Sequence, residues 1–125
     1  MFDEYAAKKF VLPTAEDIAA AQERISGVVE RTPLQYSSRL SEMTGAKIYL
    51  KREDLQGVRS YKIRGAYSVI AQLNEEERAA GVVAASAGNH AQGVAYASHV
   101  HNIPATIVMP KSAPIAKVSA TEGYG

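Results

Sequence analysis

The N-terminal part of the chain shows the spacing of apolar residues that is typical of helices. Five apolar residues fall on one side of a helix: Ile18, Ala21, Ile25, Val28 and Val29. We expect this helix to begin after Thr14, whose hydroxyl suits an N-cap, and to end near Glu30, because Thr32-Pro33 disfavours helical backbone. A shorter helix is predicted over residues 37–43.

From residue 46 onward, strand and helix patterns alternate. Strands are predicted over residues 46–51, 82–85 and 105–109, and helices over residues 60–73, 90–100 and 114–122. The short apolar run at 82–85 is typical of a strand buried on both faces. This order predicts an α/β fold of three layers, in which helices cover a parallel sheet and βαβ crossovers join its strands. A parallel sheet of so few strands leaves an open edge, so we expect an incomplete part of a larger protein.

Composition places the chain among ordinary globular proteins. It has 125 residues, of which 46% are hydrophobic and 22% are charged, and its net charge of +1 does not indicate a nucleic acid or a membrane surface as partner. The absence of cysteine excludes disulfides, thiolate nucleophiles and zinc–thiolate sites. Residues 1–13 are expected to be irregular and show no signal-peptide pattern, and no apolar run approaches the ~20 residues of a spanning helix. The expected location is the cytoplasm.

The first candidate for chemistry is Lys62, which follows a polar loop and opens a predicted helix that Ser60 would cap. The dipole of that helix disfavours a charged amine in its first turn, and partial burial would act in the same direction. An uncharged amine can act as a nucleophile and as a proton carrier, and the ring of Tyr61 could stack on a planar ligand. The alternative is a solubilising surface lysine, and Arg64 is expected to be exposed.

The second candidate is the turn over residues 86–93, after the predicted strand 82–85. Glycines allow close approach of the backbone to a ligand, and the N–H groups at the start of the next helix suit an anion. The alternative is an ordinary turn in which Asn89 caps the helix. A phosphate-binding P-loop is excluded, because Val94-Ala95 follows Gly93 where that motif requires Lys and Ser or Thr. The nearby carboxylates Glu53 and Asp54 are expected to be ion-paired with their basic neighbours.

These segments together resemble one enzyme family. The matching stretches are Lys51–Asp54, Ser60–Tyr67 and Ser86–Ala95, with support from Arg31–Leu34 and Ile107–Pro110. They are similar to threonine dehydratases (threonine ammonia-lyases), which belong to the fold type II, tryptophan-synthase-β-like enzymes that use pyridoxal phosphate. The resemblance covers nearly the whole chain from about Thr14. It is less specific for the substrate, because serine dehydratases and serine racemases share the same two motifs.

The resemblance implies a role for each matching residue. Lys62 would hold pyridoxal phosphate through a Schiff base and remove the α-proton of the substrate. Tyr61 would cover one face of the cofactor ring, and Asn89 would donate a hydrogen bond to its 3-hydroxyl group. The substrate carboxylate would be bound by the turn that contains Ser86, Gly88, Asn89 and His90. The implied reaction is the β-elimination of L-threonine, and of L-serine, to 2-oxobutanoate or pyruvate and ammonia, at the start of isoleucine synthesis or in threonine breakdown.

The chain also departs from the family pattern. It has no glycine-rich loop for the cofactor phosphate and no residue assigned to the pyridine nitrogen. By the resemblance, residues 1–45 would belong to the large domain and residues 46–125 to the small domain, which would be truncated. We therefore expect the chain alone to be inactive, with a missing C-terminal part and an oligomer in the complete protein. A serine racemase or dehydratase, or a non-catalytic fragment, remains the alternative.

Overall fold

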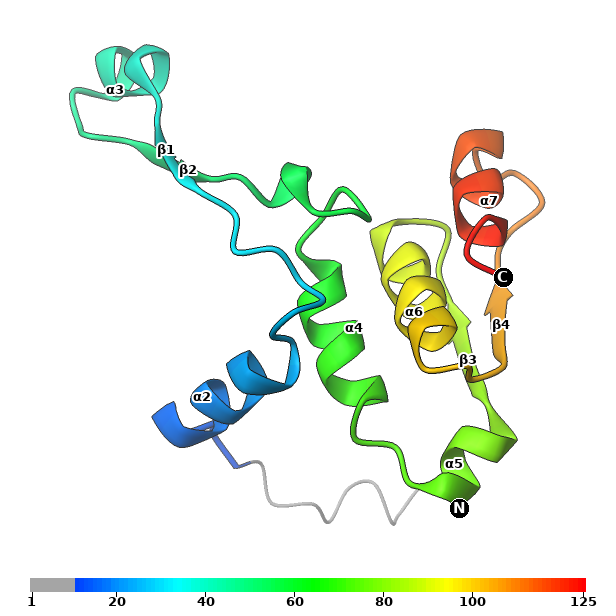
Figure 1. Cartoon of the computed structure of the whole chain (residues 1–125). Coiled ribbons are helices and arrows are strands. Elements are labelled where there is room, and N and C mark those ends of the chain that lie inside the picture. The colour runs from blue at the N-terminus through cyan, green and yellow to red at the C-terminus, as the bar shows by residue number, and fades with distance from the viewer. Residues whose placement is uncertain (1–10) are drawn as a thin grey trace.

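A computed structural model describes residues 11–125, and the predictions for residues 1–10 lie outside this range. Its elements in chain order are α2 (Ala15–Arg24), β1 (Leu34–Tyr36), α3 (Ser38–Thr44), β2 (Tyr49–Lys51), a 3-10 turn (Glu53–Leu55), α4 (Lys62–Ile70), α5 (Glu75–Ala80), β3 (Val82–Ala85), α6 (Asn89–Val100), β4 (Ala105–Val108) and α7 (Ile115–Glu122). Figure 1 shows a body built from α4, α6, β3 and β4 and an arm formed by β1, α3 and β2. Among the described residues, no helix is long and apolar enough to cross a membrane.

Helix α2 begins as predicted and ends earlier than predicted. Thr14 is its N-cap and forms a reciprocal capping box with Asp17, so both of these polar groups satisfy free backbone N–H groups. The helix ends at Arg24 instead of near Glu30. Gly27 adopts a positive φ of 81°, which breaks the helix, and three residues of the predicted stripe then pack on the core from a turn. Those residues are Ile25, Val28 and Val29.

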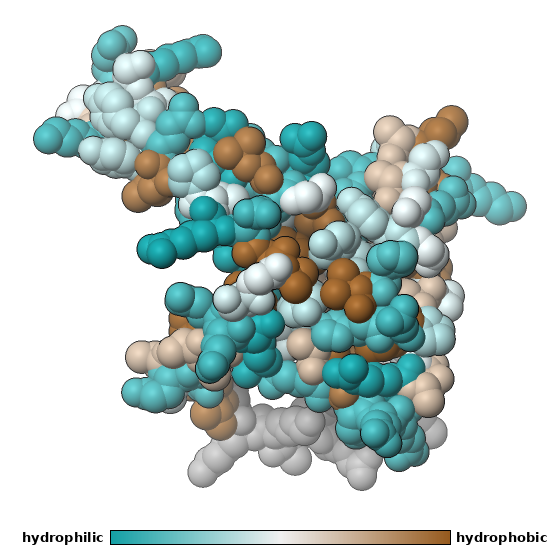
Figure 2. All heavy atoms as spheres, viewed as in Figure 1, coloured by the Kyte–Doolittle hydropathy of each residue, from teal (hydrophilic) through white to brown (hydrophobic). Residues whose placement is uncertain are grey.

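The predicted strand at 46–51 exists as β2, but its place in the fold is different from the prediction. It pairs antiparallel with β1, an element that was not predicted, with Tyr36 opposite Tyr49. The short helix α3 and Gly45, at φ 69°, turn the chain back on itself, and an antiparallel partner requires only such a return. Apolar side chains reach the surface on this arm, as Figure 2 shows. All residues of both strands are exposed.

The predicted helix over residues 60–73 is shorter in the structure and is followed by a second helix. Tyr61 is the N-cap of α4 and provides no side-chain hydrogen bond, so Ser60 is not the cap. The Ser60 side chain is instead buried beneath the start of the helix. The acidic run after residue 74 forms its own helix α5, because Asn74 and Glu77 make a capping box there.

The sheet of the body consists of β3 and β4, which pair in parallel with Val82 opposite Ala105 and Ala85 opposite Val108. Helix α6 connects the two strands as a βαβ unit, so the α/β class with a parallel sheet is confirmed. Within residues 11–125 this sheet has two strands, because the strand at 46–51 lies in the arm. Strand β3 was expected to be buried on both faces, but Val83 is 76% exposed, since helix α6 covers the opposite face.

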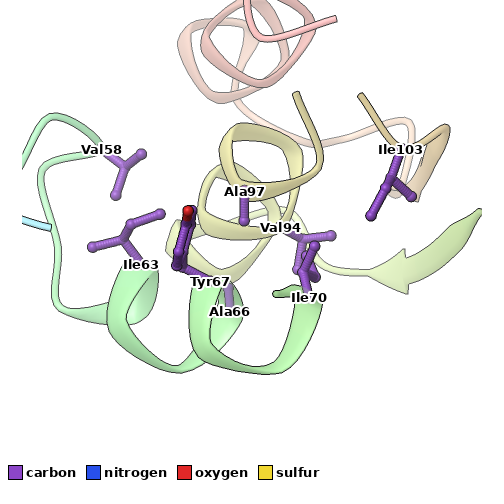
Figure 3. Packing of buried hydrophobic residues seen from close by; sticks show 8 residues of the cluster. All are labelled: Val58, Ile63, Ala66, Tyr67, Ile70, Val94, Ala97 and Ile103. Atoms are coloured by element: carbon purple, nitrogen blue, oxygen red, sulfur yellow. The ribbon is translucent and has the colours of Figure 1, made fainter. Parts of the chain in front are cut away.

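The core lies between α4 and α6. Figure 3 shows side chains from both helices meeting at this interface, together with two residues from loops. The buried cluster comprises Val58, Ile63, Ala66, Tyr67, Ile70, Val94, Ala97 and Ile103. Small buried residues lie between the two helices: Ala66 of α4, and Gly93 and Ala97 of α6. Small side chains allow two helix backbones to approach each other closely. This close packing fixes the start of α4 relative to the start of α6.

Candidate functional site

Lys62 is the first residue of α4, at the end of that helix that faces the arm. Its amine lies 4.8 Å from the centre of the Tyr61 ring, and both side chains are exposed. The partial burial expected for Lys62 is therefore wrong within the described part of the chain. Tyr61 nevertheless provides an aromatic face beside a reachable primary amine, which is the arrangement that the sequence suggested.

The backbone of Lys62 is in close contact with α6. A Cβ atom added at Gly93 would lie 3.2 Å from the carbonyl carbon of Lys62 and 3.4 Å from the Cβ of Ala66. A side chain at Gly93 would therefore require α6 and α4 to shift apart by a few tenths of an ångström. Asn89 is four residues before Gly93 and so lies on the same face of α6, one turn closer to its N-terminus. The helix packing thus brings Lys62 and the start of α6 to the same region of the molecule.

The turn from β3 into α6 holds the other four predicted residues. The backbone N–H of Ser86 donates to the carbonyl of Val108 at 3.0 Å, which ties the turn to the end of β4. The hydroxyl of Ser86 accepts from the N–H of Gly88 at 3.3 Å. Gly88 is the N-cap of α6, not Asn89, and it leaves the first N–H groups of the helix without a side-chain partner. His90, the second residue of α6, is exposed.

This arrangement has the features of an anion site. The turn lies at the carboxyl end of a parallel strand, where α/β folds place their ligands. The uncapped N–H groups and the dipole of the twelve-residue helix α6 both favour negative charge. Lys62, on the neighbouring helix α4, adds a primary amine to this region, and such an amine can react with a carbonyl group.

A polar network behind Lys62 holds the first turn of α4. The carboxylate of Glu53 accepts from Arg64 Nη2 at 2.7 Å and Nε at 2.9 Å, from Thr32 Oγ1 at 2.5 Å and from Gln56 Nε2 at 3.3 Å. These bonds, with that of Arg64 foremost, lower the pKa of Glu53 from 4.5 to about 2, although partial burial opposes the shift. Arg64 also donates to the backbone carbonyl of Glu30. The network connects two other segments, residues 30–32 and 53–56, to the helix that carries Lys62.

Two side-chain contacts around the candidate site were not predicted from the sequence. The expected ion pairing of the carboxylates is confirmed, and Asp54 pairs with Arg52 at 2.7 Å. The partner of Glu53, however, is Arg64, which was expected to be solvent-exposed and is half-buried. Lys117 of α7 was missed as well, and it donates to the side chain of Asn89 at 2.9 Å. No local pattern could identify either pair, because the partners are 11 and 28 residues apart in the chain.

Comparison with known proteins shows which family the chain resembles. A family model described as "Pyridoxal-phosphate dependent enzyme" matches residues 25–125. The "L-threonine ammonia-lyase" of Thermotoga maritima is 62% identical over 112 residues, which is 90% of this chain and 28% of that protein. The "L-threonine dehydratase biosynthetic IlvA" of Corynebacterium glutamicum is 62% identical over 103 residues, which is 82% of this chain and 24% of that protein.

Solved structures show the same relationship. The serine racemase of maize superposes with a TM-score of 0.84 at 43% identity, over 88% of this chain and 33% of that one. The chain spans about a quarter of the length of the curated relatives described above. Because the family model covers most of the sequence and the fold agrees, the chain belongs to the pyridoxal-phosphate dependent enzymes.

Proposed function

We propose that the protein catalyses the β-elimination of L-threonine, and also of L-serine, to 2-oxobutanoate or pyruvate and ammonia. The observation that carries this proposal is the packing of Gly93 against the backbone of Lys62, which brings the first residue of α4 close to the first turns of α6, whose start is uncapped by any side chain. The relatives named as threonine ammonia-lyase and threonine dehydratase support this choice of substrate and a role at the start of isoleucine synthesis.

The residues present fit the cofactor of the family. Pyridoxal phosphate is a planar aromatic aldehyde, and it requires a primary amine and an aromatic or apolar face. Lys62 supplies the amine and Tyr61 the face, with 4.8 Å between the amine and the ring centre. The bound cofactor would supply an electron sink for the carbanion at the α-carbon of the substrate. Among residues 11–125 no glycine-rich cluster is present for its phosphate, so we propose that this contact lies elsewhere in the protein.

We assign the roles as follows. Lys62 holds the cofactor and then, as a free amine, takes the proton from the α-carbon of the substrate. Asn89 donates to the 3-hydroxyl oxygen of the cofactor ring. The substrate carboxylate is bound by the turn that contains Ser86, Gly88, Asn89 and His90, through the N–H groups at the start of α6 and the polar side chains beside them. The close packing of α4 on α6 fixes the backbone of Lys62 relative to this turn, and the lysine side chain carries the proton-accepting amine.

A second candidate is the racemisation of serine on the same site, and the similarity to the serine racemase of maize favours it. Racemisation needs a second proton carrier on the opposite side of the α-carbon, and elimination does not. Both candidates share the roles of Lys62 and the turn. The ratio of D-serine to pyruvate formed from L-serine therefore separates them.

We further propose a division of the protein at residue 45. Residues 1–45 would belong to a large domain and residues 46–125 to a small domain, whose packed body contains α4, α6 and the parallel strands. The isolated chain is expected to be inactive, because Tyr61 is 59% exposed and nothing among residues 11–125 covers it. Its further partners would be the remaining part of the enzyme and a second copy in an oligomer, in the cytoplasm.

The test is reductive trapping of the cofactor. The chain is incubated with pyridoxal phosphate, reduced with borohydride, digested and examined by mass spectrometry. We expect the pyridoxyl group chiefly on Lys62, with Lys62→Arg as the matched variant that keeps the charge and loses the adduct. Modification spread evenly over the lysines would contradict the assignment of Lys62. Assays of the protein with L-threonine and L-serine then identify the oxo acid, and turnover by the isolated chain would contradict its expected inactivity.

A further inference from the structure

The side chain of Asn89 is held by a contact that the proposed reaction does not require. Lys117, in the first turn of α7, donates from its Nζ to Asn89 Oδ1 at 2.9 Å. Helix α7 packs on α6, so the two residues approach each other across a helix interface. Lys117 is half-buried and Asn89 is exposed, so this hydrogen bond lies at the solvent-facing edge of the interface.

This contact determines which half of the Asn89 amide is free. An ammonium group has three donors and no acceptor, so it can bond only to the oxygen of an amide. The oxygen of Asn89 consequently faces α7, and the two N–H donors of Nδ2 are left for another acceptor. A cation that donates to the oxygen also draws electron density from the nitrogen, which makes those N–H groups stronger donors.

We propose that Lys117 is a positioning residue, which fixes the amide of Asn89 so that Nδ2 donates to an anionic oxygen of the ligand. This inference rests on the proposed function, because it takes the ligand to be pyridoxal phosphate and the acceptor to be its 3-oxygen. Without Lys117, the amide is free to rotate and can present Oδ1 to the same oxygen, where two acceptors repel each other. Lys117 acts through Asn89 and does not itself contact the ligand.

The first experiment needs no cofactor. In the ¹⁵N-labelled chain, the Nδ2 resonance of Asn89 is compared among the wild type, Lys117→Met and Lys117→Arg. Lys111→Met is the matched control, because it removes one positive charge from the exposed loop before α7. We expect the resonance to shift in Lys117→Met only, since arginine can still donate to Oδ1. An unchanged resonance in Lys117→Met would overturn the proposal whether or not the proposed function is correct.

The second experiment measures binding of pyridoxal phosphate to the same variants and to Asn89→Ala. We expect Lys117→Met to bind about tenfold more weakly than the wild type, as for the loss of one charge-assisted hydrogen bond, and Lys117→Arg to recover most of the affinity. In the Asn89→Ala background, Lys117→Met should have no further effect. A full additional loss there would mean that Lys117 contacts the ligand directly, and would overturn the positioning role. No binding by the wild-type chain would contradict the cofactor site proposed around Lys62, and the Asn89 resonance would then test the role of Lys117 independently.

Discussion

Replacement of Glu53 by glutamine tests the polar network that holds the first turn of α4. The substitution keeps the size of the side chain, removes its charge and turns an N–H₂ group toward donors of Arg64 or Gln56. Because the pKa of Glu53 is lowered from 4.5 to about 2, and each unit corresponds to 1.36 kcal/mol, the folded state gains about 3 kcal/mol from the ionised form. We expect Glu53→Gln to lower the free energy of unfolding at neutral pH by about 2–3 kcal/mol.

The stabilisation by Glu53 should decrease as the pH is lowered. A carboxyl group with a lowered pKa stabilises the fold fully above its unfolded pKa of about 4.5, and this stabilisation is lost as the pH falls toward about 2. The wild type should therefore lose stability more steeply than Glu53→Gln over this range, until the two curves meet. Urea unfolding followed by circular dichroism at several pH values measures both curves.

The matched control is Asp54→Asn, one residue further along. Asp54 pairs with Arg52 at 2.7 Å, but 58% of its side chain is exposed, so water already solvates the charge. This variant should unfold like the wild type at neutral pH. Equal stability of the wild type and Glu53→Gln, or a loss that is the same at every pH, would refute the reasoning about the network.

Three further substitutions test the packing of the body and the amine. Gly81→Ala should destabilise the chain by about 2 kcal/mol or more in urea unfolding, because φ is 81° and the new Cβ would lie 2.7 Å from the Pro104 carbonyl oxygen. The control is Gly57→Ala, which should leave the stability unchanged because a Cβ there meets open space. Gly93→Ala should reduce trapping of pyridoxal phosphate on Lys62 several-fold, because a Cβ there meets the Lys62 backbone; unchanged trapping would show that this contact can relax. Lys62→Arg should abolish turnover of L-threonine in the full protein, measured as 2-oxobutanoate, with its fold retained by circular dichroism.

The sequence determined the local elements and the chemistry of the two motifs. Thr14 is the N-cap of α2, as predicted, and its capping box with Asp17 depends only on residues three apart. The helix at 90–100 and the strands at 82–85 and 105–109 are found within one residue of their predicted bounds, since periodicity and the bordering prolines act locally. The motifs around Lys62 and Gly88 identified the family for the same reason, because each is contiguous in the chain.

Only the tertiary structure decided which strands pair and which distant side chains contact each other. The pattern at 46–51 predicted a strand but not its pairing with Leu34–Tyr36, which depends on how α3 returns the chain. The exposure of Lys62 depends on which segments cover it, and Ser60 is buried where a cap was expected, because α4 packs on α6. Arg64 finds Glu53 and Lys117 finds Asn89 through contacts between distant segments. Such contacts follow from the packing of whole helices, so no short stretch of sequence contains them.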